Sequence, residues 1–328
     1  MTTLLVTGAA GFIGSHLVEA LLRRGDAVVG LDSFDPYYDP EAKRRNLREV
    51  RALAEADRAL TFVEGDVRDR HLLRDLLASH DVDVVVHLAG LAGVRASIDR
   101  PAAYVDVNVG GSTALLEAVR EVGVAHVVFA SSSSVYGRTE DVPFVETAPC
   151  DRPLCAYAAT KRAVEMLGHT YHHLYGTSFT ALRFFTVYGP RNRPDMMAHK
   201  LLDSAFHGRE VPLYAGGRMH RDWTFVDDVI GGVVAAADRP LGYEVLNIGR
   251  GQPILLADFV AQVEAFAGRK ANLVEQPMMH ADVPYTFADT SKAGRLLDYR
   301  PTMSIAEGVR ATGEWFVRTA AASATAES

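Results

Sequence analysis

Cysteine is scarce in this sequence, because Cys150 and Cys155 are the only two among its 328 residues. A single C-x4-C pair lacks the second pair of ligands that a structural zinc site needs. We therefore expect two reduced thiols and no metal site. A chain of this length buries about three quarters of the surface that it exposes when unfolded, so its core needs neither a disulfide nor a metal to form.

The sequence also lacks an excess of positive charge and any long apolar run. Its 34 Lys and Arg against 41 Asp and Glu leave a net charge of −7, which argues against a nucleic-acid partner, because phosphate-backbone binding needs basic residues. No apolar run approaches the roughly 20 residues of a membrane span, and the first residues form a strand pattern without a charged leader. We expect a cytoplasmic protein with no membrane partner.

Short apolar runs alternate with helical patterns in the first half of the chain. The runs are rich in β-branched residues and continuous, as in strands that are covered on both faces. We predict strands at 4–6, 27–31, 60–63, 82–88 and 124–130, and helices at 12–24, 41–57, 69–80 and 102–122. This repetition predicts the α/β class, with a Rossmann-type doubly wound parallel sheet.

The regular pattern loosens after a predicted helix at 154–175 and a predicted strand at 179–184. Turn clusters at 189–194 and 215–217 are followed by shorter elements, which indicates a smaller C-terminal α/β domain. We predict a nucleotide-binding domain at 1–183 plus about 222–249, and a substrate-binding domain at about 184–221 and 250–318. Residues 319–328, rich in Ala, Ser and Thr, are predicted to form a flexible tail.

Gly8, Gly11 and Gly14 lie directly between the first predicted strand and the first predicted helix. Glycines at this spacing allow a tight turn, close approach to a pyrophosphate and close helix–strand packing. Asp32 ends the second predicted strand, where a carboxylate can accept hydrogen bonds from both ribose hydroxyls and would repel a 2′-phosphate. The pattern therefore predicts an NAD site and disfavours NADP.

Two later strand ends extend this predicted site. Asp66 ends the third strand, where its side chain could reach the adenine amine, and the small Ala89 ends the fourth, where the cofactor can lie against the backbone. Ligands bind at this carboxyl edge in parallel sheets. The predicted NAD contacts include two residues that are described in the next paragraph, Tyr157 and Lys161. The full predicted set is Gly8, Gly11, Phe12, Ile13, Gly14, Asp32, Ser33, Asp66, Val67, Leu88, Ala89, Tyr157 and Lys161.

A run of serines from 131 to 134 ends the fifth strand, and Tyr157 and Lys161 follow on a helix. Tyrosine and lysine at i and i+4 share one helical face. An ammonium group and the positive nicotinamide ring would stabilise a tyrosinate, whose pKa starts near 10. The three elements predict a base that removes an alcohol proton while hydride passes to NAD.

The glycine motif, Asp32, the serines and the Tyr–Lys pair occur in the order found in extended short-chain dehydrogenase/reductases, which the sequence resembles over nearly its whole length. Within that superfamily it resembles UDP-glucuronate 4-epimerases. The segments that carry this resemblance are FDPYYD at 34–39, AGVRAS at 92–97, RFFTVYGPR at 183–191, DMMAHK at 195–200 after Arg193-Pro194, and RDWTFVDD at 221–228.

Carried over position by position, the resemblance implies three catalytic residues: Tyr157 as base, Lys161 as its electrostatic partner and Ser132 as second donor to the C4 oxygen. It also implies that Lys200 and the 213–214 strand hold uracil, that Arg221 holds the diphosphate and that Asp282 holds the ribose. Met279 stands where galactose-type epimerases place an arginine, so Arg221 is expected to carry more of the diphosphate charge. The implied substrate-binding residues are Arg95, Ser132, Ser133, Ser134, Tyr157, Thr186, Arg193, Lys200, Leu213, Tyr214, Arg221 and Asp282.

The residues that follow the position of Ser132 differ between enzymes of this superfamily that catalyse different reactions. The resemblance implies an Asp–Glu pair there in 4,6-dehydratases, and a glutamate at the position of Ser134 in decarboxylases that act on UDP-glucuronate. Ser133 and Ser134 are neutral, which disfavours both reactions. With Thr186 they can hold a sugar carboxylate by neutral hydrogen bonds, and Arg193 is the candidate cation.

The sequence is therefore expected to encode an NAD-dependent nucleotide-sugar 4-epimerase, most simply one that converts UDP-glucuronate to UDP-galacturonate through a 4-keto intermediate. NAD would be tightly bound and recycled in each turnover. A UDP-glucose/galactose 4-epimerase, or another UDP-sugar epimerase of the family, is the alternative, and a non-catalytic NAD-sensing protein is a remote one. The helices at 102–122 and 154–175 could pair in a homodimer, which the resemblance favours.

Overall fold

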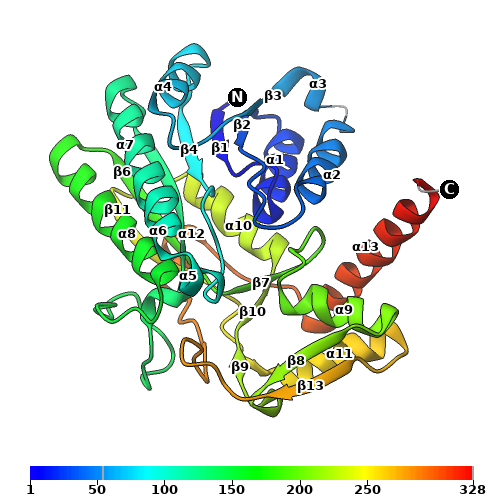
Figure 1. Cartoon of the computed structure of the whole chain (residues 1–328). Helices are drawn as coiled ribbons and strands as arrows, with labels where there is room; N and C mark the ends of the chain where they lie inside the picture. The colour runs from blue at the N-terminus through cyan, green and yellow to red at the C-terminus, as the bar shows by residue number, and fades with distance from the viewer. Residues whose placement is uncertain (54, 327–328) are drawn as a thin grey trace.

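The computed structural model describes residues 1–53 and 55–326 and has a seven-stranded sheet at its centre (Figure 1). All neighbouring strands are parallel, in the order β11-β6-β5-β4-β1-β2-β3. The Rossmann-type prediction is confirmed, and every predicted strand is present. The strands are β1 (Thr3–Thr7), β2 (Ala27–Asp32), β3 (Leu60–Glu64), β4 (Val84–His87), β5 (His126–Ser132), β6 (Ser178–Phe184) and β11 (Tyr243–Ile248).

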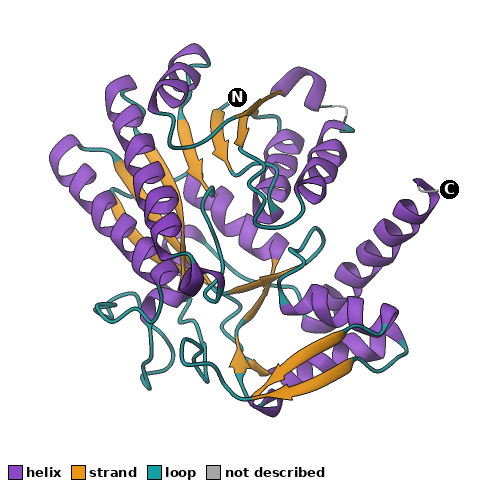
Figure 2. Ribbon diagram, in the orientation of Figure 1, coloured by secondary structure: helices purple, strands orange, loops and turns teal. Residues whose placement is uncertain are grey.

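Helices cover both faces of this sheet, because successive strand residues point to opposite sides and both sets are apolar. Leu4 and Val6 pack in one core with the first and tenth helices, whereas Leu5 and Val29 pack in another with the fourth, seventh and eighth. Figure 2 shows these two helical layers. The helices are α1 (Phe12–Arg24), α2 (Pro40–Arg51), α3 (Ala56–Ala59), α4 (Arg70–Ser79), α7 (Gly111–Val122), α8 (Ala156–Tyr175), α10 (Val226–Ala237) and α12 (Ser291–Leu297).

Two predicted helices are interrupted. The helix predicted at 41–57 is divided into α2 and α3, and residue 54 lies outside the described residues. The helix predicted at 102–122 is built from α6 (Pro101–Tyr104), a π-helical segment η1 (Val105–Gly110) and α7, preceded by α5 (Ala96–Asp99). The wider turn of η1 holds the buried Asn108, whose amide bonds both the N–H and the C=O of Leu91. A side-chain bond to a distant loop is invisible to helical periodicity.

A smaller set of elements lies beyond the carboxyl edge of the sheet (Figure 1). Trp223 and Phe259 stack at 3.8 Å in its core. We predicted this region as a separate substrate domain, and those boundaries stay a prediction; α13 continues through part of the predicted tail. The elements are β7 (Thr186–Tyr188), α9 (Met197–His207), β8 (Glu210–Tyr214), η3 (Ala215–Gly217), β9 (His220–Arg221), β10 (Trp223–Phe225), β12 (Ile254–Leu255), α11 (Leu256–Ala267), β13 (Asn272–Gln276) and α13 (Ile305–Ala326).

Candidate active site

A cavity of about 400 Å³ opens at the carboxyl edge of the sheet. Parallel α/β sheets bind ligands at this edge, near the point where the strand order reverses, which here lies between β1 and β4. Every residue predicted to contact the cofactor lines this cavity, and so do Ser132, Ser133, Ser134, Thr186 and Arg193. The structure thus brings together two sets of residues that sequence patterns predicted separately.

The glycine turn leaves no space for side chains. A Cβ on Gly14 would lie 2.0 Å from the carbonyl oxygen of Gly8, and one on Gly8 would lie 2.9 Å from the backbone nitrogen of Ala89. Gly8 also has a φ of +72°, which an L side chain rarely adopts. Helix α1 begins just after Gly11, which supplies no side-chain cap, so its first N–H groups can serve an anion. This cradle fits a pyrophosphate.

Asp32 is buried at the end of β2, and its carboxylate is oriented by the backbone. Its two oxygens accept hydrogen bonds from the N–H groups of Ala10 at 3.1 Å and Phe34 at 2.9 Å. Lys43 Nζ lies 3.7 Å from Oδ1 and also lines the cavity. Sequence reasoning missed Lys43, because it is one of several basic residues along α2 and only the fold shows that it is buried.

Asp66 lies on the cavity wall, but its carboxylate already has a partner. Arg68 donates to Oδ1 through its backbone N–H at 2.8 Å and its Nε at 3.0 Å, and to Oδ2 through Nη2 at 2.6 Å. These hydrogen bonds hold the pKa of Asp66 below its usual range. An adenine amine at this position would share the carboxylate with Arg68, so the predicted adenine contact stays a prediction.

The predicted catalytic residues come from two elements. Ser132 is the last residue of β5, and the short helix η2 (Ser133–Tyr136) follows it directly. The hydroxyl of Ser132 accepts a hydrogen bond from the N–H of Ser134 at 3.2 Å and donates one to Ser134 Oγ at 3.1 Å. Tyr157 and Lys161 lie on the first turns of α8, and Lys161 Nζ is 5.9 Å from the centre of the Tyr157 ring. All three line the cavity.

Burial dominates the electrostatics of this pair. It raises the pKa of Tyr157, while the hydrogen bond from Ser132 and the charge of Arg193 oppose that rise. Burial also lowers the pKa of Lys161 to about 8. We expected the lysine to lower the tyrosine pKa, but Lys161 is not among the groups that shift it, and burial is the largest effect. Ser132 and Arg193 therefore matter more for the tyrosinate than the Tyr–Lys spacing indicates.

Asn108 is a second residue that the sequence did not reveal. Its side chain bonds the backbone of Leu91 and, through Nδ2, the Thr160 hydroxyl at 3.1 Å. A Cβ on Gly90 would lie 3.0 Å from Asn108 Oδ1 and 3.5 Å from Lys161 Nζ. Asn108 thus holds the loop after β4 beside Lys161.

Arg193 reaches the cavity from the turn after β7. Its Nε and Nη2 donate to the two oxygens of Asp195 at 2.9 and 3.0 Å, and the hydroxyl of Tyr37 donates to the same carboxylate at 3.1 Å. Burial alone would disfavour the charged guanidinium, yet the carboxylate of Asp195 raises the pKa of Arg193. Arg193 therefore stays charged beside the serines and Thr186.

A second cavity of about 180 Å³ continues from the first, since Ser133, Ser134 and Thr186 line both. Arg221 and Asp282 line it, and their predicted contacts with the diphosphate and the ribose stay predictions. Arg95 Nη2 donates to Asp282 at 2.9 Å, and its guanidinium lies 3.9 Å from the centre of the Tyr214 ring. Leu213 adjoins Tyr214 on β8, and Lys200 lies on α9. Four of the predicted substrate residues line neither of these two cavities: Arg95, Lys200, Leu213 and Tyr214.

No three His, Cys, Asp or Glu side chains in residues 1–53 and 55–326 are grouped so that they could hold a metal ion. Among these same residues, no helix combines the length and the apolar character that crossing a membrane requires.

Comparisons with known proteins give related sequences and structures. Residues 4–249 match the model of the NAD dependent epimerase/dehydratase family. UDP-glucuronate 4-epimerase 4 of Arabidopsis thaliana is 42% identical over 96% of this chain and 75% of its own length. The crystal structure of UDP-glucuronic acid 4-epimerase from Bacillus cereus, in complex with UDP-glucuronic acid and NAD, has a TM-score of 0.89 at 35% identity, over 97% of this chain and 100% of that one. The UDP-glucose 4-epimerase of Thermotoga maritima, with UDP-glucose, has a TM-score of 0.87 at 30% identity, over 97% and 100%.

Proposed function

The chain belongs to the NAD dependent epimerase/dehydratase family, and we propose that it interconverts UDP-glucuronate and UDP-galacturonate. At the coarser level it is an NAD-dependent enzyme that inverts C4 of a UDP-sugar. The observation that carries the finer proposal is the charged Arg193 beside Ser133, Ser134 and Thr186, on the same cavity as Tyr157.

The residues of the main cavity fit NAD. The glycine cradle suits a pyrophosphate, the oriented carboxylate of Asp32 suits the ribose hydroxyls, and Lys161 Nζ reaches the same cavity. When bound, NAD supplies the acceptor and donor of hydride. The negative Asp32 would also repel a 2′-phosphate, which favours NAD over NADP.

Tyr157 is proposed as the group that exchanges a proton with the C4 oxygen. As tyrosinate it removes the hydroxyl proton, and it returns that proton when the opposite epimer forms from the 4-keto sugar. Ser132 donates to the same oxygen and also lowers the pKa of Tyr157 by hydrogen bonding. Lys161 lies on the same helical face, with Nζ 5.9 Å from the centre of the Tyr157 ring, and its ammonium is proposed as the electrostatic partner of the tyrosinate.

A uronate needs more control than a hexose. Its 4-keto form is a β-keto acid, which loses carbon dioxide when the bond to the carboxylate stands perpendicular to the ketone plane. Neutral donors from Ser133, Ser134 and Thr186, with the cation of Arg193, can hold the carboxylate away from that geometry. None of the residues from 131 to 137 is acidic, which supports re-reduction rather than elimination or decarboxylation.

A neutral UDP-hexose is the alternative substrate, because the Ser–Tyr–Lys set acts at C4 whatever C6 carries. Incubation of the purified protein with UDP-glucuronate and UDP-glucose in separate reactions, followed by NMR of the sugars, distinguishes the two. We expect UDP-galacturonate from the first and little UDP-galactose from the second. Rapid epimerisation of UDP-glucose with none of UDP-glucuronate would assign the protein to the alternative.

A homodimer is a further part of the proposal. Val105 on η1 and Met166, Leu174 and Tyr175 on α8 are large apolar residues that are half or more exposed, and α7 and α8 pack side by side (Figure 1). A second copy of this helix pair would cover them in a four-helix contact. Light scattering after gel filtration should give twice the monomer mass, and Met166→Glu with Leu174→Glu should give the monomer.

A further inference from the structure

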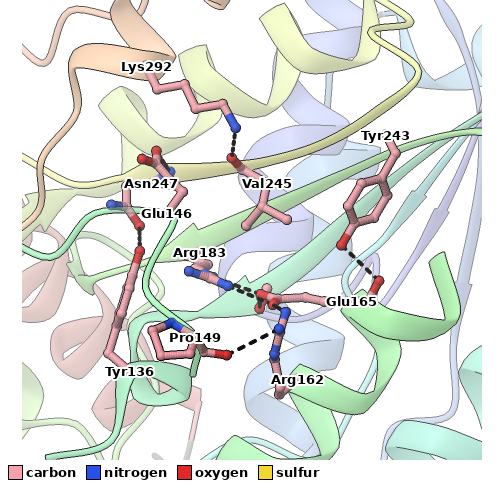
Figure 3. A network of polar contacts seen from close by, with 11 residues as sticks. Tyr136, Glu146, Pro149, Arg162, Glu165, Arg183, Tyr243, Val245, Asn247 and Lys292 are labelled. Atoms are coloured by element: carbon pink, nitrogen blue, oxygen red, sulfur yellow. Dashed lines mark hydrogen bonds and ion pairs between the residues drawn. The ribbon is translucent and has the colours of Figure 1, made fainter. Parts of the chain in front are cut away.

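Figure 3 shows a buried ion cluster formed by Glu165, Arg183 and Arg162, which the reaction as described does not use. Glu165, on α8, accepts four hydrogen bonds: from Ser131 Oγ at 2.6 Å, from Arg183 Nε and Nη2 at 2.9 Å each, and from Arg162 Nη1 at 3.0 Å. The side chain of Glu165 is 0% exposed and that of Arg183 is 1% exposed. These four hydrogen bonds therefore fix the position of the Glu165 carboxylate.

This cluster holds both ends of the serine segment. Ser131, on its amino-terminal side, bonds Glu165, and Tyr136, on its carboxyl-terminal side, lies with its ring 4.7 Å beneath the Arg183 guanidinium. The Tyr136 hydroxyl also donates to Asn247 on β11 at 2.7 Å. Ser132 thus lies on a short segment that is held on both sides by side chains in contact with one ion pair.

The same cluster holds the catalytic helix. Tyr157, Lys161 and Glu165 follow one another at intervals of four residues on α8, so they share one face. The side chain of Glu165 joins that face to β5 and β6, and its backbone carbonyl accepts the Tyr243 hydroxyl at 3.1 Å (Figure 3). A shift or rotation of α8 relative to β5 and β6 would have to lengthen or break these bonds.

Stability alone does not account for such a pair. A buried ion pair loses the hydration of two charges, and well-packed apolar side chains of similar volume often give an equally stable protein. Apolar contacts are not directional, whereas the four hydrogen bonds of the Glu165 carboxylate fix the positions of the residues around it. Catalysis needs that accuracy, because a misplacement of about 1 Å can slow a reaction about 100-fold.

We propose that Glu165 and Arg183 are positioning residues that set the distance between Ser132 and the Tyr157–Lys161 pair. The proposal rests on the proposed function, since it concerns the proton exchange at Tyr157. Neither Glu165 nor Arg183 lines either of the two cavities, so both would act through Ser131, Tyr136 and helix α8.

The test replaces the ion pair by apolar side chains in the double variant Glu165→Leu with Arg183→Met. We expect a folded protein that binds NAD and UDP with dissociation constants within about threefold of the wild type. Its kcat for UDP-glucuronate should fall about 10- to 100-fold with little change in KM.

A pH profile separates positioning from a merely structural role. The Ser132 hydrogen bond lowers the pKa of Tyr157, so a misplaced Ser132 should move the acid limb of kcat to higher pH, and raising the pH should recover part of the lost rate. The groups that face Tyr157 and stay unchanged in the variant are Lys161 and Cys155 from its own helix region, Arg193 from the turn after β7, Tyr37 from the loop after β2 and Tyr104 from α6.

Two further variants complete the experiment. Ser131→Ala keeps the ion pair and deletes one bond to the strand, so it should fold and show the same shift of the acid limb with a smaller loss of kcat. The control, Arg24→Met with Asp26→Leu, removes a partly buried ion pair at the opposite edge of the sheet and should change neither quantity. Wild-type kcat and pH profile in both Glu165→Leu/Arg183→Met and Ser131→Ala would overturn the proposal. A wild-type protein without epimerase activity would instead overturn the proposed function.

Discussion

Arg193 and Asp195 pair along only one edge of the guanidinium group, because Nε and Nη2 take the carboxylate. Nη1 forms no hydrogen bond to any residue in the part of the chain that the structure describes, and Arg193 lines the main cavity. A guanidinium group is planar and can hold a carboxylate at each of two edges. The second edge is therefore available to a substrate carboxylate.

Arg193→Ala is predicted to discriminate between two nucleotide sugars. Loss of a charge-assisted contact costs about 1.5–3 kcal/mol, so the dissociation constant for UDP-glucuronate should rise roughly 10- to 150-fold. UDP-glucose lacks the carboxylate, and its affinity should change little. Calorimetric titration with both sugars checks this, and an equal loss for both would show that Arg193 does not bind the carboxylate.

Ser132→Ala should shift the pH dependence of turnover. The serine hydroxyl lowers the pKa of Tyr157 against the effect of burial, so its removal raises that pKa and leaves less tyrosinate at neutral pH. The acid limb of kcat is expected to move to higher pH.

Tyr157→Phe, which keeps the ring and removes the base, should abolish turnover while NAD binding persists. Substantial epimerisation by that variant would remove Tyr157 from its proposed role.

Asp32 should set the cofactor preference. Its carboxylate is oriented by Ala10 and Phe34 and would face the 2′-phosphate of NADP in a poorly screened site. Asp32→Ala is predicted to weaken the binding of NAD and to narrow the difference in affinity between NAD and NADP. Lys43, 3.7 Å away, limits the size of the effect. Fluorescence titration measures both affinities, and equal wild-type affinities would contradict the assignment.

Thr186→Val combined with Ser133→Ala should remove neutral hydrogen bonds to the sugar carboxylate while its charged partner, Arg193, stays in place. The 4-keto acid would then reach the geometry in which it loses carbon dioxide. We expect slower epimerisation and some UDP-pentose among the products, which chromatography and mass spectrometry detect. The single variant Ser134→Ala is a useful comparison, because Ser134 also bonds Ser132. Slower turnover with no pentose in any variant would separate these residues from control of decarboxylation.

Local patterns predicted the sheet and the nucleotide cradle well. Continuous apolar runs gave the strands, and Gly11 and Gly14 are constrained by the nearby Gly8 and Ala9, so short-range reasoning was sufficient there; the space around Gly8 is limited by the distant Leu88 and Ala89. The residues that it missed depend on contacts between distant segments. Lys43 matters only because α2 folds over the end of β2, and Asn108 only because η1 packs against the loop at Leu91.

The buried pair of Glu165 and Arg183 was missed for the same reason. Each charge alone looks like a solvated residue, and only the packing of α8 against β6 places them together. The contact of Arg95 with Asp282 likewise joins segments that are far apart in the chain. No spacing rule connects such residues, because the fold creates the relationship.

The most direct test of the account uses UDP-glucuronate that carries deuterium at C4, incubated with the purified protein in ordinary water. If C4 is oxidised and then reduced within one closed site, the UDP-galacturonate product keeps the deuterium at C4, and NMR of the sugar shows this at the reacting carbon. Proton exchange at Tyr157 involves only the C4 oxygen, so solvent hydrogen does not enter the carbon position. A product with hydrogen at C4, or recovery of only unchanged UDP-glucuronate, would contradict the account.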